Sequence, residues 1–166
     1  MNQVTQTAMQ NLSIINEVPQ PPFTSDTLYI GSGPSYYHKA IISFDLTQFP
    51  CYVGGMINVV FSLHFNRVVS GILNPKRCFY LGILNSKNNL NKIIPTNITT
   101  NLKSKSNPCY LDFNITNVFR QIQATKMSKL NLVIYTESNF NCICEFHSIN
   151  SKNPPILAGT FTSNFS

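Results

Sequence analysis

Charged residues are scarce in this chain: they make up 11% of its 166 residues, less than half of the roughly 25% typical of globular proteins. The polar surface must therefore consist mostly of Asn, Ser and Thr. The twelve Lys and Arg residues are dispersed, and only Lys76 and Arg77 are adjacent. Because nucleic-acid binding needs clustered positive charge, we expect no nucleic-acid partner. A surface with so few charges instead favours self-association.

Long apolar runs are also absent. No stretch approaches the roughly eighteen apolar residues that span a bilayer, so we expect no membrane-integral segment. The chain opens with MNQVTQTAMQNLSIINEVPQ, which lacks the basic region and the apolar run of a secretory signal. We therefore expect that the protein does not leave the cytosol by that route.

Catalytic signatures are missing as well. The acidic residues, six in all, are scattered singly, whereas a glycosidase needs two carboxylates facing each other across a cleft. His38, His64 and His147 lie on strand-like runs without the local signature of a nucleophilic triad. The sequence contains no G-x-S-x-G, no H-E-x-x-H and no glycine-rich phosphate loop. We expect neither enzymatic activity nor a cofactor.

The cysteines, five in number, are the main reactive groups: Cys51, Cys78, Cys109, Cys142 and Cys144. Zinc is one use to weigh, because Cys142 and Cys144 share a strand face and His147 is close in sequence. Their Cβ atoms would lie about 7 Å apart on a strand, however, which suits a tetrahedral zinc site poorly. No EF-hand-like cluster of oxygen ligands indicates calcium.

Disulfides are the remaining use, and all five cysteines are candidates for links between subunits. We expect Cys109 to be the partner of Cys142 and Cys144, in the next subunit or in the same one. An odd number of cysteines leaves at least one without a partner in its own chain. The sequence places Cys51, Cys78 and Cys109 at turns or strand ends, where thiols can reach a neighbour. Two of the five are expected instead to be free, buried and apolar. Cytosolic thiols stay reduced, so cross-linking would follow release into an oxidising environment.

Composition divides the chain into an N-terminal arm, residues 1–25, and a domain, residues 26–166. The arm ends in the proline-rich sequence VPQPPF, which favours an extended segment. Its apolar residues, which we predict to make subunit contacts, are Val4, Leu12, Ile14 and Ile15. They fit a helical stripe or a short strand, and periodicity does not decide between them. Because terminal arms are ordered only when tied down, we expect this one to pack on its own domain or on a neighbour.

The domain reads as short β-type runs separated by turn clusters, which predicts an all-β sandwich. The clearest run spans residues 56–69, where apolar and polar residues alternate with the period of two of a half-buried strand. Further strands are predicted at 26–31, 39–46, 78–84, 109–113, 130–137, 140–148 and 154–161, with one short strand in the polar stretch 85–107. Residues 114–123 predict a short helix capped by Asn114 or Thr116, with Ile115, Val118, Phe119 and Ile122 on one face.

Four of these segments, in order, carry a resemblance to a known family. They read KAIISFDLTQFP, MINVVFSLHF, YLDFNITNVFRQI and FHSINSKNPPILAGTF. Together they resemble the DNRLRE domain, a secreted jelly-roll module related to carbohydrate-binding modules, over residues 26–162. The resemblance implies an antiparallel jelly-roll β-sandwich. The chain departs from the family at Ile149 and Asn150, where Arg-Glu is frequent, and it has no Trp.

These features combine into an expectation about function. We expect a structural subunit of a fibre, appendage or coat, located outside the cell or on a spore surface after release by lysis. The arm would add a strand to a neighbour's sheet and so produce a head-to-tail homopolymer. The alternative is a carbohydrate-binding module, in which Tyr36 and Tyr37 would stack against a glycan.

Overall fold

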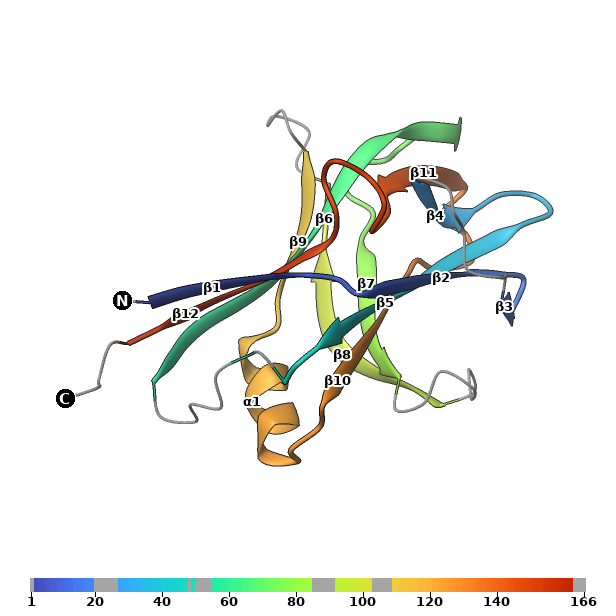
Figure 1. Cartoon of the computed structure of the whole chain (residues 1–166). Helices are drawn as coiled ribbons and strands as arrows, with labels where there is room; N and C mark the ends of the chain where they lie inside the picture. Colours follow the sequence, from blue (N-terminus) through green and yellow to red (C-terminus); the bar gives the residue numbers. More distant parts are fainter. Residues whose placement is uncertain are drawn as a thin grey trace.

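The computed structural model describes residues 2–19, 27–47, 49, 55–84, 92–102 and 109–162 of the chain. These residues form a curled antiparallel β structure with one short helix, as Figure 1 shows. The strands are β1 (Asn2–Thr7), β2 (Gln10–Ile15), β3 (Val18–Pro19), β4 (Thr27–Ser32), β5 (Tyr37–Asp45), β6 (Met56–Gly71), β7 (Phe79–Leu84), β8 (Ile93–Thr100), β9 (Tyr110–Asn114), β10 (Lys129–Tyr135), β11 (Cys142–His147) and β12 (Ile156–Phe161), and the helix is α1 (Thr116–Ala124). The predicted all-β class is confirmed.

The longest strand, β6, connects the parts of the sheet. Its first half pairs with β12 on one side and with β9 on the other, and its second half pairs with β11. The strand order is β1-β12-β6-β11-β4-β5-β10-β7-β8, with β9 attached to β6, β2 attached to β5, and β3 attached to β2. No helix among the described residues is long and apolar enough to cross a bilayer.

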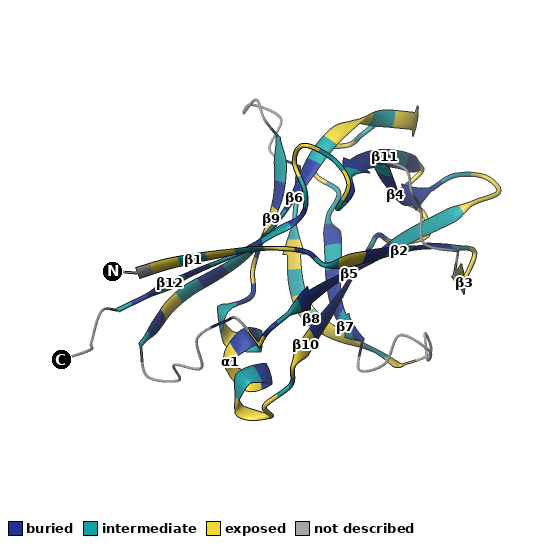
Figure 2. Cartoon of the chain, viewed as in Figure 1, coloured by how far each residue is buried: buried dark blue, intermediate teal, exposed yellow. Residues whose placement is uncertain are grey.

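Phenylalanines and leucines are the commonest residues of the main core, and Figure 2 colours buried residues dark blue along the strands and the helix. Phe61 of β6 is fully buried and lies edge-to-face on Phe44 of β5, with the ring centroids 5.8 Å apart. Its other neighbour is Phe113 of β9, which stacks on it at the same distance. These contacts join strands from distant parts of the sequence into one core.

Strands β5 and β10 are buried on both faces, which explains why their sequences are apolar without alternation. In β5, Ala40, Ile42 and Phe44 belong to the main core, whereas Ile41 belongs to a second apolar cluster. That second cluster consists of Ile14, Ile41, Leu84 and Val133, with Leu12, Ile93 and Tyr135 packed against it. A strand buried on both faces needs apolar residues at successive positions.

The N-terminal segment forms strands rather than a helix. β1 pairs with β12 over six residues, from Asn2 opposite Phe161 to Thr7 opposite Ile156, and β2 pairs with β5. We expected the arm to pack either on its own domain or on a neighbour, and residues 2–19 pack on their own domain. The strand form prevails because β12 and β5 offer rows of backbone partners, which local periodicity does not reveal.

Two elements differ in detail from expectation. The polar stretch 85–107 contains an eight-residue strand, β8, which is longer than the short strand predicted. Helix α1 begins at Thr116. Ile115 occupies the N-cap position, and its side chain makes no capping hydrogen bond. Asn114 contributes locally all the same, because its Oδ1 accepts a hydrogen bond from the backbone N–H of Thr116 at 3.2 Å.

Candidate assembly surface

The outer edge of β1 is an unpaired edge of the sheet among the described strands. β1 pairs with β12 on one side, and no other described strand pairs with it. Its sequence, NQVTQT, contains no charge and no proline, and its register with β12 has no irregularity. Proteins commonly protect such an edge with charges, prolines or bulges, because its unpaired N–H and C=O groups recruit other strands. β1 has none of these protections.

The edge strand β8, at the other end of the strand order, is protected. It contains Pro95, and its register with β7 shifts between Tyr80 and Gly82. Asn97 adds a positive φ of 61° within the same strand. A proline and a bulge both interrupt the regular row of backbone groups that a new strand requires. Of the two strands at the ends of the strand order, only β1 is therefore unprotected.

Contacts with its own domain hold β1 in place while its other side stays open. Val4 is half-buried and packs against the main core, and the Gln6 side chain donates a hydrogen bond to the carbonyl of Asp45. Gln3, Thr5 and Thr7 alternate with these residues and are exposed, as the yellow segments of β1 in Figure 2 show. The strand therefore presents short, uncharged side chains to solvent along a fixed backbone.

The other predicted arm residues lie on β2. Ile14 is buried in the second apolar cluster and Leu12 packs against that cluster, so both contact their own chain. Ile15 is half-buried, opposite Val18 of β3 and His38 of β5. The structure thus places Leu12 and Ile14 in the fold and leaves β1 as the part of the arm that is accessible to a neighbour.

Four of the five cysteines lie within the described residues, and Cys78, Cys142 and Cys144 are free thiols. Cys142 and Cys144 are 1% and 0% exposed, and their Sγ atoms are 3.8 Å apart. Burial raises the pKa of both thiols, which disfavours the reactive thiolate. Within the described residues, no three His, Cys, Asp or Glu side chains gather to hold a metal ion.

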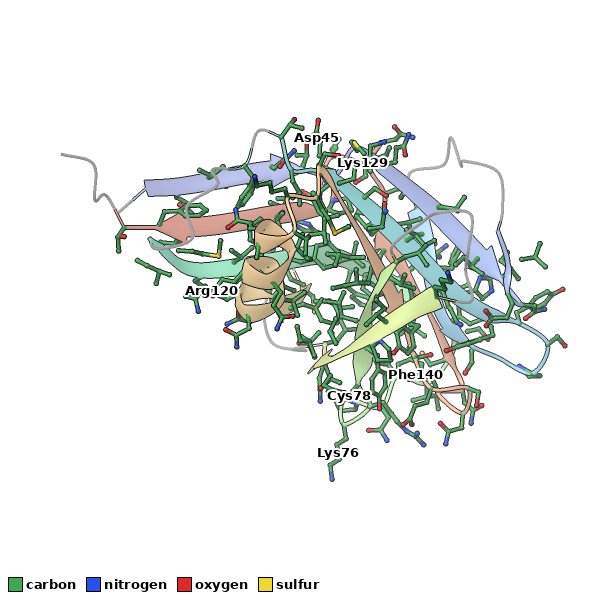
Figure 3. The ribbon with its side chains drawn as sticks, turned by 90° about the horizontal axis from the view of Figure 1, so that it is seen from below. Asp45, Lys76, Cys78, Arg120, Lys129 and Phe140 are labelled. Atoms are coloured by element: carbon green, nitrogen blue, oxygen red, sulfur yellow. The ribbon has the colours of Figure 1, made fainter. Side chains whose placement is uncertain are left out.

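The remaining cysteines are more accessible. Cys78, labelled in Figure 3, is half-buried just before β7, and its Sγ lies 3.3 Å from Oδ1 of Asn101. Cys109 is half-buried just before β9, and burial together with the charge of Asp112 raises its pKa. Cys51 lies outside the described residues. Of the predicted disulfide positions described, Cys78 and Cys109 are therefore the better placed to reach another subunit.

The two tyrosines predicted to stack on a glycan have different surroundings. Tyr36 is 57% exposed, in the turn between β4 and β5. The Tyr37 hydroxyl donates a hydrogen bond to the carbonyl of Thr136, and the Lys39 ammonium lies 5.0 Å from the centroid of the Tyr37 ring. Burial is the main cause that raises the pKa of Tyr37 to about 12. Only Tyr36 therefore offers a largely open ring.

A polar pocket of about 430 Å³ lies between β6, β8, β9 and α1. Amides, hydroxyls and one guanidinium line it, together with apolar Ile57, Ile98 and Val118, and the lining contains no carboxylate. Arg120, labelled on α1 in Figure 3, donates from Nη2 to the carbonyl of Met56 at 2.8 Å. Sequence reasoning missed this pocket because its residues come from separate elements and match no motif.

Two histidines that lie on separate predicted strands, His64 and His147, are close to each other in the fold. His64 of β6 is buried, its ring centroid lies 4.0 Å from that of Tyr110, and His147 of β11 is 6.2 Å away. Nδ1 of His64 is buried and has no hydrogen-bond partner. Burial and then the nearby His147 lower the pKa of His64, whereas Asp112 acts in the opposite direction. The neutral form is therefore favoured in the fold.

Comparison with known proteins identifies no family. No protein-family model matches the chain, and no curated protein matches its sequence.

Proposed function

We propose that the protein is a structural subunit that assembles with copies of itself through its N-terminal arm. The observation that carries this proposal is the open edge of β1, which is six residues long, regular and uncharged. Strand addition at such an edge satisfies its backbone N–H and C=O groups and orients the partner. The low proportion of charged residues in the chain leaves few side chains that could protect an edge strand by charge.

The four ordered sequence motifs support a DNRLRE-like jelly-roll as the finer description of the domain. In that description the protein functions outside the cell or on a spore surface and reaches it by cell lysis. Disulfides between subunits would then form after release, and the half-buried Cys78 and Cys109 are the described thiols best placed for them. Cys142 and Cys144 would remain in the core as apolar residues.

Negative charge on β1 tests the proposal. Thr5 and Thr7 are both exposed, so the double variant T5E/T7E leaves the core unchanged while it adds the charges that protect natural edge strands. We expect the wild type to form large assemblies and T5E/T7E to remain monomeric in sedimentation velocity and electron microscopy.

The control is T99E, which places one glutamate at an exposed threonine of the protected edge strand β8. This variant should assemble as the wild type does. Circular dichroism of each variant checks that the fold is retained. Assemblies of T5E/T7E equal to those of the wild type would contradict the proposal.

The polar pocket favours a second candidate function, carbohydrate binding. Its volume of about 430 Å³ falls within the range of small-ligand sites. Amides, hydroxyls and Arg120 can donate hydrogen bonds to sugar hydroxyls, and Tyr36 provides an exposed ring elsewhere on the surface. This candidate predicts binding on a glycan array that weakens when Asn117, an exposed pocket residue, is changed to Ala. An array without any bound glycan would eliminate it.

A further inference from the structure

We propose that β1 pairs with β1 of a second copy of the chain, antiparallel to it, about a two-fold axis that passes beside Thr5. This inference rests on the proposed self-assembly and identifies the strand that the edge of β1 receives. Among the described strands and helix, β12 is the one that runs along β1, and Figure 1 shows β1 along the outer side of β12. The other side of β1 is therefore the side on which a second copy would pair.

The hydrogen bonds of β1 show which of its backbone groups face outward. The N–H of Ala8, directly after β1, donates to the carbonyl of Pro155, directly before β12, at 2.9 Å. In an antiparallel pair, alternate residues of a strand direct both their N–H and their C=O to the same neighbour. The even-numbered residues of β1 therefore face β12, as Ala8 does. The residues of β1 whose N–H and C=O face outward are Gln3, Thr5 and Thr7.

One register pairs all three of these residues at once. With Thr5 opposite Thr5 of the second copy, Gln3 of each copy lies opposite Thr7 of the other. In each of these pairs the two residues exchange both of their backbone hydrogen bonds. The outward-facing groups of β1 are thus centred on Thr5, which makes the edge complementary to itself. A contact that uses the same surface on both copies is the one that a two-fold axis generates.

The side chains of β1 also suit a two-fold contact. A charge close to the axis would meet the same charge of the second copy, and like charges directly opposite each other destabilise a strand pair. β1 contains no charged residue. Gln3, Thr5 and Thr7 are exposed, and a pair of threonines opposite each other contributes favourably to a sheet. On the other face, the half-buried Val4 would lie opposite the half-buried Gln6 of the second copy.

The two-fold contact by itself ends at a dimer, because each copy uses its only β1 edge. In that dimer, the sheet of one copy continues into the sheet of the other through β12, β1, β1 and β12. The dimer would be the unit from which the larger assemblies of the proposed function grow. The proposed disulfides, formed after release, would link such dimers to one another.

A cysteine beside the axis tests this register. The variant T5C is made in a background with C51S, C78S and C109S, so that these thiols do not compete for the cross-link. Residues of a hydrogen-bonded antiparallel pair have Cα atoms about 5.5 Å apart, which is within the range of about 4.4–6.8 Å found for disulfides. After mild oxidation, we expect T5C to migrate mainly as a covalent dimer on a non-reducing gel and as a monomer after reduction.

The matched control is T7C in the same background, because Thr7 is exposed as Thr5 is. In the proposed register the two copies of residue 7 are four positions apart along the strands, or roughly 13 Å. T7C alone should therefore stay monomeric, whereas a mixture of T7C with Q3C should form the covalent dimer. Circular dichroism checks that the background and each variant keep the fold.

The outcomes separate this inference from the proposed function. A monomeric T5C, or a T7C that cross-links with itself as fully as T5C does, overturns the two-fold register. If T5E/T7E still blocks assembly in that case, self-assembly through β1 stands with a different partner strand. Normal assembly of T5E/T7E overturns the proposed function itself.

Discussion

Removal of residues 1–19 is expected to unfold the protein rather than to release a stable domain without its arm. The deletion takes away the partners of both β12 and β5, because β1 pairs with the first and β2 with the second. It also removes Ile14 from the second apolar cluster and exposes Ile41, which is fully buried in the intact chain.

The size of this effect follows from burial. Each fully buried aliphatic side chain stabilises a fold by about 1.5–3 kcal/mol, and the deletion affects several of them together with two rows of backbone hydrogen bonds. We expect a loss of more than about 5 kcal/mol, which is comparable with the whole stability of a typical domain. Urea unfolding followed by circular dichroism measures it.

A single substitution on β2 provides the control for this deletion. Ile14→Ala should cost about 2–5 kcal/mol, because it opens a cavity in the second cluster without removing any strand pairing. A truncated protein that unfolds at the same urea concentration as the full chain would show that the arm is separate from the fold. Because truncation disturbs the fold, charges on β1 are the cleaner test of assembly.

Phe61→Ala is the second substitution with a large expected effect. The Phe61 ring is fully buried and contacts both Phe44 and Phe113, so it connects β6 to β5 and β9. Truncation of a buried phenylalanine to alanine loses its burial and leaves a cavity, which together cost about 3–5 kcal/mol. A decrease of this size in the free energy of unfolding should appear in urea titrations.

The same strand contains a matched control. Ile57 is 43% exposed and lies near the start of β6, so Ile57→Ala should change the free energy of unfolding by less than about 1 kcal/mol. Equal losses for the two substitutions would show that the core does not depend on the contacts of Phe61.

The local pattern predicted the strands of the domain well. The alternation over residues 56–69 corresponds to β6, and the runs at 39–46 and 130–137 correspond to β5 and β10. These predictions succeeded because successive side chains of a strand point to opposite faces, so that burial leaves a period of two or a continuous apolar run. Both signals lie within a few consecutive residues.

The conformation of the arm could not be predicted in the same way. NQVTQT has no strong periodicity, and it becomes a strand because β12 provides backbone partners about 150 residues later in the chain. Likewise, the predicted disulfide positions did not reveal that the thiols of Cys142 and Cys144 are buried 3.8 Å apart. Exposure of a thiol depends on packing from other strands.

The sequence by itself determined the all-β class, the placement of most strands, the low charge and the position of every thiol, because composition and local periodicity carry that information. Only the tertiary structure decided that β1 is the unprotected edge and that His64 meets His147. An edge is defined by the strand that is missing beside it. That absence depends on the pairing of the whole sheet, which no single segment specifies.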